Sequence, residues 1–351
     1  MNSIKLNNIL IGDGNPCVVI PEGCSNHMGS LDKAKEMAYK AKEAGAEIIK
    51  WQMHLPEEEM VKEEAIKASK KSPVKWGSIW DFYKKFALSV EDHYKLKEYC
   101  NQIGIQYFCT PFSLKAAQIL NDMGVYGFKI GSGETEDLLM LEEITKFKKP
   151  LIVSTGMSDF FDIDATANVL KDNGTPFALA HCVSIYKDQK ISQLNYGLIS
   201  ELKNRYQVPV GLSDHTPPEN QEPRIWGAVC HGANFIEKHF TLDKKQNDAD
   251  SWFSLEPDDL KNLIKIVKEA EEASGTEKKV FEEEKLVEEW AKRSIISAVD
   301  IKEGSIITRE TLISKRPGTG IRSRDYKQII GKKTKVFIPK NTLIKWENIE
   351  K

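Results

Sequence analysis

The sequence predicts a (β/α)8 barrel of the TIM type followed by a small β-rich domain. Short β-branched runs alternate with longer amphipathic runs, and eight such pairs fall within about 260 residues, the usual size of this barrel. After Gly275 the composition changes to a densely charged run and then to short apolar runs separated by Gly or Asn turns. That change marks a domain boundary.

The predicted strands are runs rich in β-branched and aromatic residues. They are 17–23, 47–52, 105–112, 126–132, 150–156, 176–182, 209–215 and 234–240. Helical spacing follows nearly every one. In 31–45, apolar residues recur on one face from Leu31 to Ala41, and Gly45 is a natural C-terminal stop. The other helical runs are 89–104, 114–124, 137–148, 162–174, 196–206, 222–232 and 257–275.

A doubly wound sheet is the competing topology. It needs no eighth strand, and its first turn is usually Gly-rich, whereas the first turn here reads PEGCSNHMG. One excursion, between Gln52 and Ser89, interrupts the rhythm with the aromatic segment WGSIWDFYKKFAL. A long insertion after a barrel strand lies over the barrel mouth, so we expect this segment to cover the site.

Three segments describe the expected domain organisation. Residues 1–275 form the barrel, 276–292 are a charged linker that is either a helix or extended, and 293–351 form the small domain. The last segment contains two similar units, IKEGSIIT and IPKNTLIK, whose turns between β-branched runs favour short strands.

Composition excludes several classes of partner. Lys and Arg number 50 against 52 Asp and Glu, so no global charge draws the protein to nucleic acid or to an anionic membrane. No apolar run approaches a membrane span, and the N-terminus lacks a signal-peptide pattern, so we expect a cytoplasmic protein. Six scattered cysteines without a C-x-x-C pair favour reduced, buried thiols.

Polar side chains end almost every predicted strand. Because active sites of such barrels lie at the C-terminal ends of the strands, these residues are candidates for function. They are Glu22, Lys50, Gln52, Thr110, Lys129, Ser132, Glu134, Ser154, Thr155, His181, Ser213, His215, Glu237 and His239.

The stretch NFIEKHFTLD refines this set by parity. Side chains alternate along a strand, so Glu237 and His239 share one face while Lys238 takes the other. His215 ends the preceding strand, so His215 and His239 are expected to approach within metal-binding distance, in a site suited to Mn, Fe, Co or Zn. A lone buried His is more often structural, but a pair at adjacent strand ends favours a metal.

Lysines and hydroxyls beside glycines predict a phosphorylated ligand. Lys50 and Lys129 are cationic donors, and the turns GSGE, STG and GLSD let backbone N–H groups approach an anion. The alternative for Lys129 is a Schiff-base lysine, as in class I aldolases.

The ordered motifs KIGSGE, STGM, HC, GLSDH, IEKHFTLD, FSLEP and KRPGTGI resemble the sialic acid synthase family of nonulosonate synthases. The resemblance covers the whole chain, including a C-terminal antifreeze-like (SAF) domain. It implies condensation of phosphoenolpyruvate with an N-acyl hexosamine to a nine-carbon 2-keto acid, with release of phosphate. It also implies a divalent metal, most often Mn with Mg or Co as alternatives, that polarises the sugar aldehyde.

The resemblance assigns roles by motif. It implies that His215 and His239 hold the metal and that Glu22 and Glu134 are catalytic. The implied substrate-binding residues are Lys50, Gln52, Thr110, Lys129, Ser132, Ser154, Ser184, Tyr186, Ser213, Glu237, Asp250 and Arg316. Arg316, in KRPGTGI, resembles an arginine that the small domain delivers to the partner's barrel, which implies a domain-swapped homodimer.

Departures from the family pattern gather on the sugar side. HMG replaces HNG after the first strand, Ser184 replaces an asparagine, and Ser251 replaces a histidine and is followed by Trp252. We expect unchanged chemistry with an altered sugar: a 2,4-diacetamido-6-deoxy hexose leading to a legionaminic or pseudaminic acid, with N-acetylmannosamine as the alternative. A Schiff-base aldolase and a non-catalytic carbohydrate-binding protein are the hypotheses from other classes.

Overall fold

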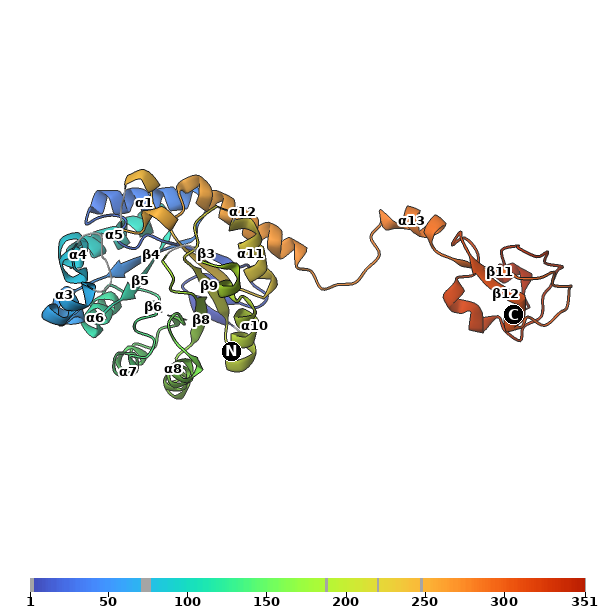
Figure 1. Cartoon of the computed structure of the whole chain (residues 1–351), viewed down its shortest axis with the longest axis horizontal. Coiled ribbons are helices and arrows are strands. Elements are labelled where there is room, and N and C mark those ends of the chain that lie inside the picture. Colours follow the sequence, from blue (N-terminus) through green and yellow to red (C-terminus); the bar gives the residue numbers. More distant parts are fainter. Residues whose placement is uncertain (1–2, 71–76, 187–188, 220, 247–248, 351) are drawn as a thin grey trace. The chain divides into compact units, whose positions relative to one another are not determined.

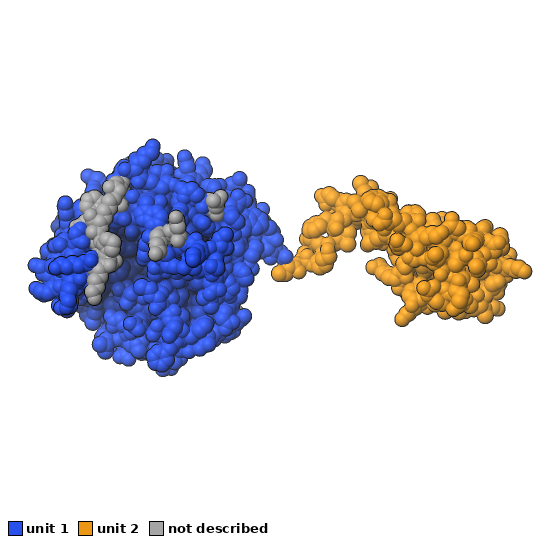
Figure 2. Space-filling view, in the orientation of Figure 1, with its two compact units in different colours: residues 1–275 blue, residues 276–351 orange. Residues whose placement is uncertain are grey.

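The computed structural model describes residues 3–70, 77–186, 189–219, 221–246 and 249–350. The chain divides into two compact units, Met1–Gly275 and Thr276–Lys351, which Figure 2 colours separately. Each unit has its own hydrophobic core, so each is described by itself.

Eight parallel strands form the barrel of the first unit (Figure 1). They are β3 (Val18–Glu22), β4 (Ile48–Met53), β5 (Gln106–Pro111), β6 (Phe128–Ile130), β7 (Leu151–Ser154), β8 (Phe177–Cys182), β9 (Val210–Asp214) and β10 (Phe235–His239). The pairing order is β5-β4-β3-β10-β9-β8-β7-β6, so the first and last strands of the barrel pair and the ring is nearly closed. The predicted barrel is confirmed.

Helices surround the strands (Figure 1). They are α1 (Leu31–Glu43), α5 (Val90–Ile103), α6 (Leu114–Asp122), α7 (Leu138–Thr145), α8 (Phe160–Asp172), α9 (Ile191–Leu194), α10 (Gly197–Tyr206), α11 (Gln221–Cys230) and α12 (Pro257–Ala273). Local sequence sets their ends. In α5 the Ser89 hydroxyl accepts from the Asp92 N–H at 3.1 Å, and Gly104 ends the helix with φ of +72°.

An N-terminal hairpin, which was not predicted from the sequence, closes the end of the barrel at which the strands begin. Strands β1 (Ser3–Leu6) and β2 (Ile9–Gly12) pair antiparallel. Their apolar side chains form one cluster with residues inside the barrel: Ile4, Leu6, Ile9, Ile11, Val18, Ile20, Ile48, Phe108, Ile152, Ala178, Ala180 and Phe235. Each strand has only four residues, too few for period-2 alternation to stand out in the sequence.

The insertion after β4 is helical where it is described. It contains α2 (Pro56–Glu59), α3 (Lys62–Ser69) and α4 (Ile79–Phe86). Two short 3-10 helices, η1 (Lys244–Gln246) and η2 (Ser251–Phe253), follow β10.

The second unit is small and rich in isoleucine. It holds α13 (Glu284–Ala291), β11 (Ser294–Ser297), β12 (Leu312–Lys315), η3 (Arg309–Thr311), η4 (Ser323–Gln328) and η5 (Trp346–Asn348). Helix α13 lies in the segment expected to be a linker. The Gly318 N–H donates to the Glu289 carbonyl at 2.7 Å, and Arg322 pairs with Glu288 at 2.9 Å. This helix is therefore bound to the small unit.

None of the helices formed by the described residues is long and apolar enough to cross a membrane.

Candidate active site

A cavity of about 630 Å³ lies at the carboxyl ends of the barrel strands. It brings together nearly all of the side chains that the sequence singled out. The predicted residues that line it are Lys50, Gln52, Thr110, Lys129, Ser132, Glu134, Ser154, Ser184, Tyr186, Ser213, His215, Glu237, His239 and Asp250. Convergence of so many polar side chains in one cavity is typical of an active site.

Two lysines and two carboxylates form a buried network at the base of the cavity. The Lys50 Nζ lies 2.5 Å from a Glu22 carboxylate oxygen and 3.6 Å from Glu237 Oε1. Lys129 Nζ lies 3.6 Å from the same Glu237 oxygen, which also accepts from the Ser213 hydroxyl at 3.0 Å. One carboxylate thus compensates two cations that approach from different strands.

Burial and mutual attraction compete in this network. Burial opposes the charge on Glu237, but Lys129 and Lys50 hold its pKa below the usual value. Burial raises the pKa of Glu22 to about 7. For Lys129, burial lowers the pKa despite the pull of Glu237. At Lys50 burial also opposes the charge, but Glu22 and Glu237 raise the pKa, so Lys129 gives up its proton more readily than Lys50.

Small hydroxyl residues surround a space that a glycine keeps open. Lys129 Nζ donates to the Ser154 hydroxyl at 2.5 Å. A Cβ added at Gly156 would collide with the Ser132 and Ser184 hydroxyls. The absence of a side chain at that position lets these hydroxyls share one space close to Lys129, an arrangement suited to an oxyanion.

The two histidines lie side by side, as parity predicted. Strands β9 and β10 pair with Ser213 beside Glu237 and Asp214 beside Lys238, so the next step of this register brings His215 to His239. Their ring centroids are 5.2 Å apart. His215 Nδ1 faces the sulfur of Cys182 at 3.9 Å.

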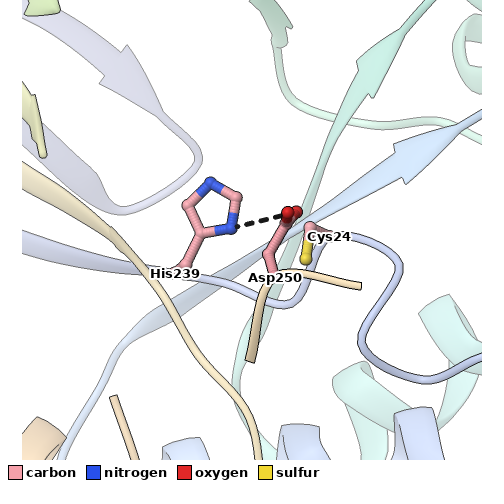
Figure 3. Close-up of side chains that lie close together, drawn as sticks. All are labelled: Cys24, His239 and Asp250. Carbon is pink, nitrogen blue, oxygen red and sulfur yellow. Dashed lines mark ion pairs between the residues drawn. The ribbon is translucent and has the colours of Figure 1, made fainter. Parts of the chain in front are cut away.

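Donors around His239 fit a divalent metal. His239 Nδ1 lies 3.5 Å from Asp250 Oδ2, and among the described residues this buried nitrogen has no hydrogen-bond partner. Burial, then His215 and Lys50, hold the pKa of His239 well below its usual value, so the ring is the neutral imidazole that a metal requires. Cys24 completes a compact group with these two residues (Figure 3).

Glu134 lies on the opposite part of the cavity wall. Burial, with help from Glu59, raises the pKa of Glu134 to about 7. Its Oε2 is buried without a hydrogen-bond partner among the described residues. A carboxyl group with this pKa can exchange a proton near neutral pH.

The insertion after β4 covers part of the cavity, as predicted. Ile79, Phe82 and Tyr83 of α4 line it. The ring of His54 is stacked between Tyr83 and Phe112, with centroids 3.5 Å and 4.0 Å away, and its Nε2 bonds the Gln52 amide oxygen at 3.1 Å. These rings attach the insertion to the end of β4.

Two residues proposed as strand-end candidates face away from the cavity, which corrects that prediction. His181 Nε2 bonds the Leu194 carbonyl at 2.8 Å, and Thr155 donates to the Ala180 carbonyl at 3.0 Å. Both stand at positions of the wrong parity, so they pack between the strands and the outer helices. Lys238 also lies outside, as expected, where it pairs with Asp214 at 2.5 Å.

Two further predicted residues do not line the cavity. Glu22 lies behind Lys50 and is almost completely buried. Arg316 belongs to the second unit, where its Nε donates to the Ala291 carbonyl at 3.0 Å and its guanidinium lies 5.6 Å from the Trp290 ring.

Sequence reasoning missed several residues of the cavity wall. They are Ser25, Phe112, Met157 and Cys182, whereas Ile79, Phe82 and Tyr83 belong to the insertion that was predicted to cover the site. Parity could have found Cys182, because it follows the outward-facing His181 on β8. Parity could likewise have found Phe112, which lies two residues after Thr110, whereas an insertion has no fixed register that would single out its side chains.

Family models match most of the chain. Residues 37–279 match the NeuB family, and residues 292–350 match the SAF domain. The chain belongs to the NeuB family. The predicted family and the C-terminal SAF domain are therefore confirmed.

Similar proteins accompany this NeuB-family match. An uncharacterized protein of Methanocaldococcus jannaschii is 36% identical over 353 residues, 99% of each chain. The N,N'-diacetyllegionaminic acid synthase of Legionella pneumophila is 34% identical over 97% of this chain and 96% of its own. The N-acetylneuraminic acid (sialic acid) synthetase structure from Leptospira borgpetersenii, with citrate, is 30% identical with a TM-score of 0.72, over 81% of this chain and 94% of its own.

The named relatives are synthases of nonulosonic acids, which confirms the prediction of a synthase-type enzyme.

Proposed function

We propose that the protein condenses phosphoenolpyruvate with an open-chain N-acyl hexosamine, giving a nine-carbon 2-keto acid and phosphate. The observation that supports this most is one cavity that holds two buried lysines beside hydroxyls and, on adjacent strands, a histidine pair. The first group suits an anionic phosphoenol, and the second suits a metal and an aldehyde.

The chain's own residues hold and orient phosphoenolpyruvate. Lys129 and Ser154 bind the phosphate, with the Ser132 and Ser184 hydroxyls in the space left by Gly156. Lys50, held by Glu22 and Glu237, neutralises the remaining negative charge. Fixing the phosphoenol in this way directs its C3 atom towards the histidine pair.

The sugar lies on the side of the histidines. His215 and His239 would hold the divalent ion, which we propose to be manganese, and this ion when bound supplies Lewis-acid polarisation of the aldehyde. Asp250 and Tyr186 line the cavity beside them. As the C–C bond forms at C3, water adds at C2, and the C2–O bond to phosphate then breaks.

Glu134 is the proposed general base for that water. A base acts as the carboxylate, so kcat should rise with pH through about 7, the pKa to which burial raises Glu134. The substitution Glu134→Gln is expected to lower kcat by roughly 10²- to 10⁴-fold and to remove this limb of the pH profile. Initial rates between pH 5.5 and 9 provide the measurement.

Glu136→Gln is the matched control, because Glu136 is exposed two residues away. Its rate and pH profile should match those of the wild type. An unchanged profile in Glu134→Gln would show that another group takes the proton.

One observation favours a second function. Burial lowers the pKa of Lys129, which a Schiff-base lysine also requires. A class I lyase would form an adduct with pyruvate that borohydride traps on Lys129 and would keep its activity in the presence of chelator. The synthase should form no such adduct.

Phosphate release tests the proposed function directly. The chelator-treated enzyme receives phosphoenolpyruvate with N-acetylmannosamine or with 2,4-diacetamido-6-deoxy hexoses, with and without added Mn²⁺. Mn²⁺-dependent release with one sugar would support the synthase and identify the acceptor. No release with any sugar from enzyme that binds Mn²⁺ would contradict it.

We expect a 2,4-diacetamido-6-deoxy hexose to be preferred. Ser184, Ser251 and Trp252 line the cavity where they depart from the family pattern, and the Legionella relative is a legionaminic acid synthase. Discrimination by single contacts is worth about 1–3 kcal/mol each, or roughly 10- to 200-fold in kcat/KM.

A cytoplasmic homodimer completes the proposal, with Arg316 of one subunit acting at the other subunit's barrel. Arg316→Ala and His215→Ala chains are each expected to be inactive alone. The mixture should recover up to about a quarter of wild-type activity, because random pairing makes half of the dimers mixed and each mixed dimer has one intact site of two. Mixed dimers without activity would contradict the swapped arrangement.

A further inference from the structure

Cys24 has no role in the function proposed above, yet it lies against two of its residues. It follows β3 and is completely buried. Its sulfur, an imidazole nitrogen of His239 and a carboxylate oxygen of Asp250 all lie within 4.8 Å of one another (Figure 3). These are three different ligand types from three separate segments of the chain.

The spacing of these atoms suits one small ion. Ligand atoms at about 2.0–2.3 Å from a tetrahedral ion are about 3.3–3.8 Å apart. His239 Nδ1 and Asp250 Oδ2 already meet this condition at 3.5 Å. The ligand atoms of the group are at most 4.8 Å apart, which is about 1 Å more than the upper end of this range. Small side-chain rotations can close that difference.

The imidazole supplies an independent indication of a ligand. His239 is more than nine-tenths buried, and its Nδ1 faces Asp250 but has no hydrogen-bond partner among the described residues. A buried nitrogen without a hydrogen-bond partner is destabilising, and a bound ion or water is one way to satisfy it. A metal ion between these residues would satisfy that nitrogen.

We propose that Cys24 is a thiolate ligand of a divalent ion bound by His239 and Asp250. This rests on the proposed function only in that both use an ion at His239. His215, whose ring centroid lies 5.2 Å from that of His239, lies outside this compact group of three residues. The sulfur binds as thiolate, so its proton passes to solvent when the ion enters.

A thiolate changes which metals the site prefers. Sulfur ligands favour Zn²⁺ and Co²⁺, whereas Mn²⁺ and Mg²⁺ favour oxygen. The site should therefore bind Zn²⁺ and Co²⁺ much more tightly than Mn²⁺. Cys24 is then a residue that determines metal specificity.

Cobalt absorption tests the ligand. Full-length protein freed of metal is titrated with Co²⁺, and the wild type should develop an intense near-ultraviolet band from sulfur-to-cobalt charge transfer. Cys24→Ser should lose this band, and its Zn²⁺ affinity should fall at least tenfold, with a smaller change for Mn²⁺. Cys230→Ser, which removes an exposed thiol, should behave like the wild type. A band that survives in Cys24→Ser overturns the proposal.

X-ray absorption of the Zn²⁺-loaded wild type needs no variant and so holds even if Cys24→Ser does not fold. One sulfur at about 2.3 Å from zinc is expected. A shell made only of nitrogen and oxygen overturns the proposal. Phosphate release measured on the same wild-type preparation separates the two hypotheses. Release without a sulfur ligand removes only the role of Cys24, and a sulfur ligand without release for any sugar removes only the synthase function.

Discussion

Replacing His239 by glutamine is expected to lower metal-dependent phosphate release by at least about 10³-fold, because Lewis-acid stabilisation is worth several kcal/mol and each 1.36 kcal/mol is tenfold in rate. His239 lies beside His215 and Asp250, and its imidazole is neutral. Glutamine keeps a similar volume but offers a poor metal ligand. Initial rates with Mn²⁺, together with bound metal after dialysis, provide the measurement.

His231→Gln is the matched control. His231 is exposed on the barrel surface, where its Nδ1 lies 3.4 Å from the Ser200 hydroxyl, and it does not line the cavity. It should keep wild-type rates and metal content. Wild-type activity in His239→Gln would mean that no metal at this residue takes part in the reaction.

Replacing Lys238 by methionine is expected to reduce the free energy of unfolding by about 3–5 kcal/mol, because it leaves Asp214 charged and buried without its cation. The side chains of Lys238 and Asp214 are only 1% and 4% exposed, and they meet at 2.5 Å. Lys238 also donates to the Thr216 carbonyl at 2.6 Å. Urea unfolding followed by circular dichroism measures the loss.

The double variant Lys238→Met/Asp214→Asn tests the cause. Asparagine can still accept from the Thr216 N–H, which lies 3.0 Å from Asp214 Oδ1, and no charge is stranded. The double variant should therefore be more stable than Lys238→Met alone. Lys265→Ala, which removes an exposed pair with Glu269, should cost less than about 1 kcal/mol. Equal losses in the single and double variants would contradict this explanation.

The Lys238–Asp214 pair also predicts that the folded protein loses stability at acid pH. Burial opposes ionisation of Asp214, but Lys238 more than offsets it and lowers the pKa. A lowered folded-state pKa contributes stability above the unfolded value of about 3.9 and loses it as pH falls through the folded value. Lys238→Met should lose less stability than the wild type between pH 5 and pH 2.

The local sequence was sufficient to predict the strands and to predict which side chains of β10 share a face. Each of the eight predicted strands overlaps an observed one, because β-branched runs between turn residues are a strong local signal. Parity separated Glu237 and His239 from Lys238 without any tertiary information. The same rule, applied to β8, would have turned His181 outward and Cys182 inward.

Other features depend on contacts between distant segments. The β1–β2 hairpin is too short to identify locally and is held by the barrel residues that it covers. Helix α13 lies in the segment that the sequence left open as a helix or an extended linker, and only the structure shows that Glu288 and Glu289 bind residues more than 25 positions away. The aromatic contacts of His54 also join segments that no local pattern connects.

The sequence alone determined the barrel, the family and the identity of most polar residues in the cavity, because strand period and motif order are local properties of the chain. Only the tertiary structure decided which groups interact. Glu237 pairs with both Lys50 and Lys129, and Cys24 lies close to His239 and Asp250. Closing the barrel brings residues more than 200 positions apart, such as Cys24 and His239, into one buried cluster. There, distances of a few ångströms set each pKa and each ligand group.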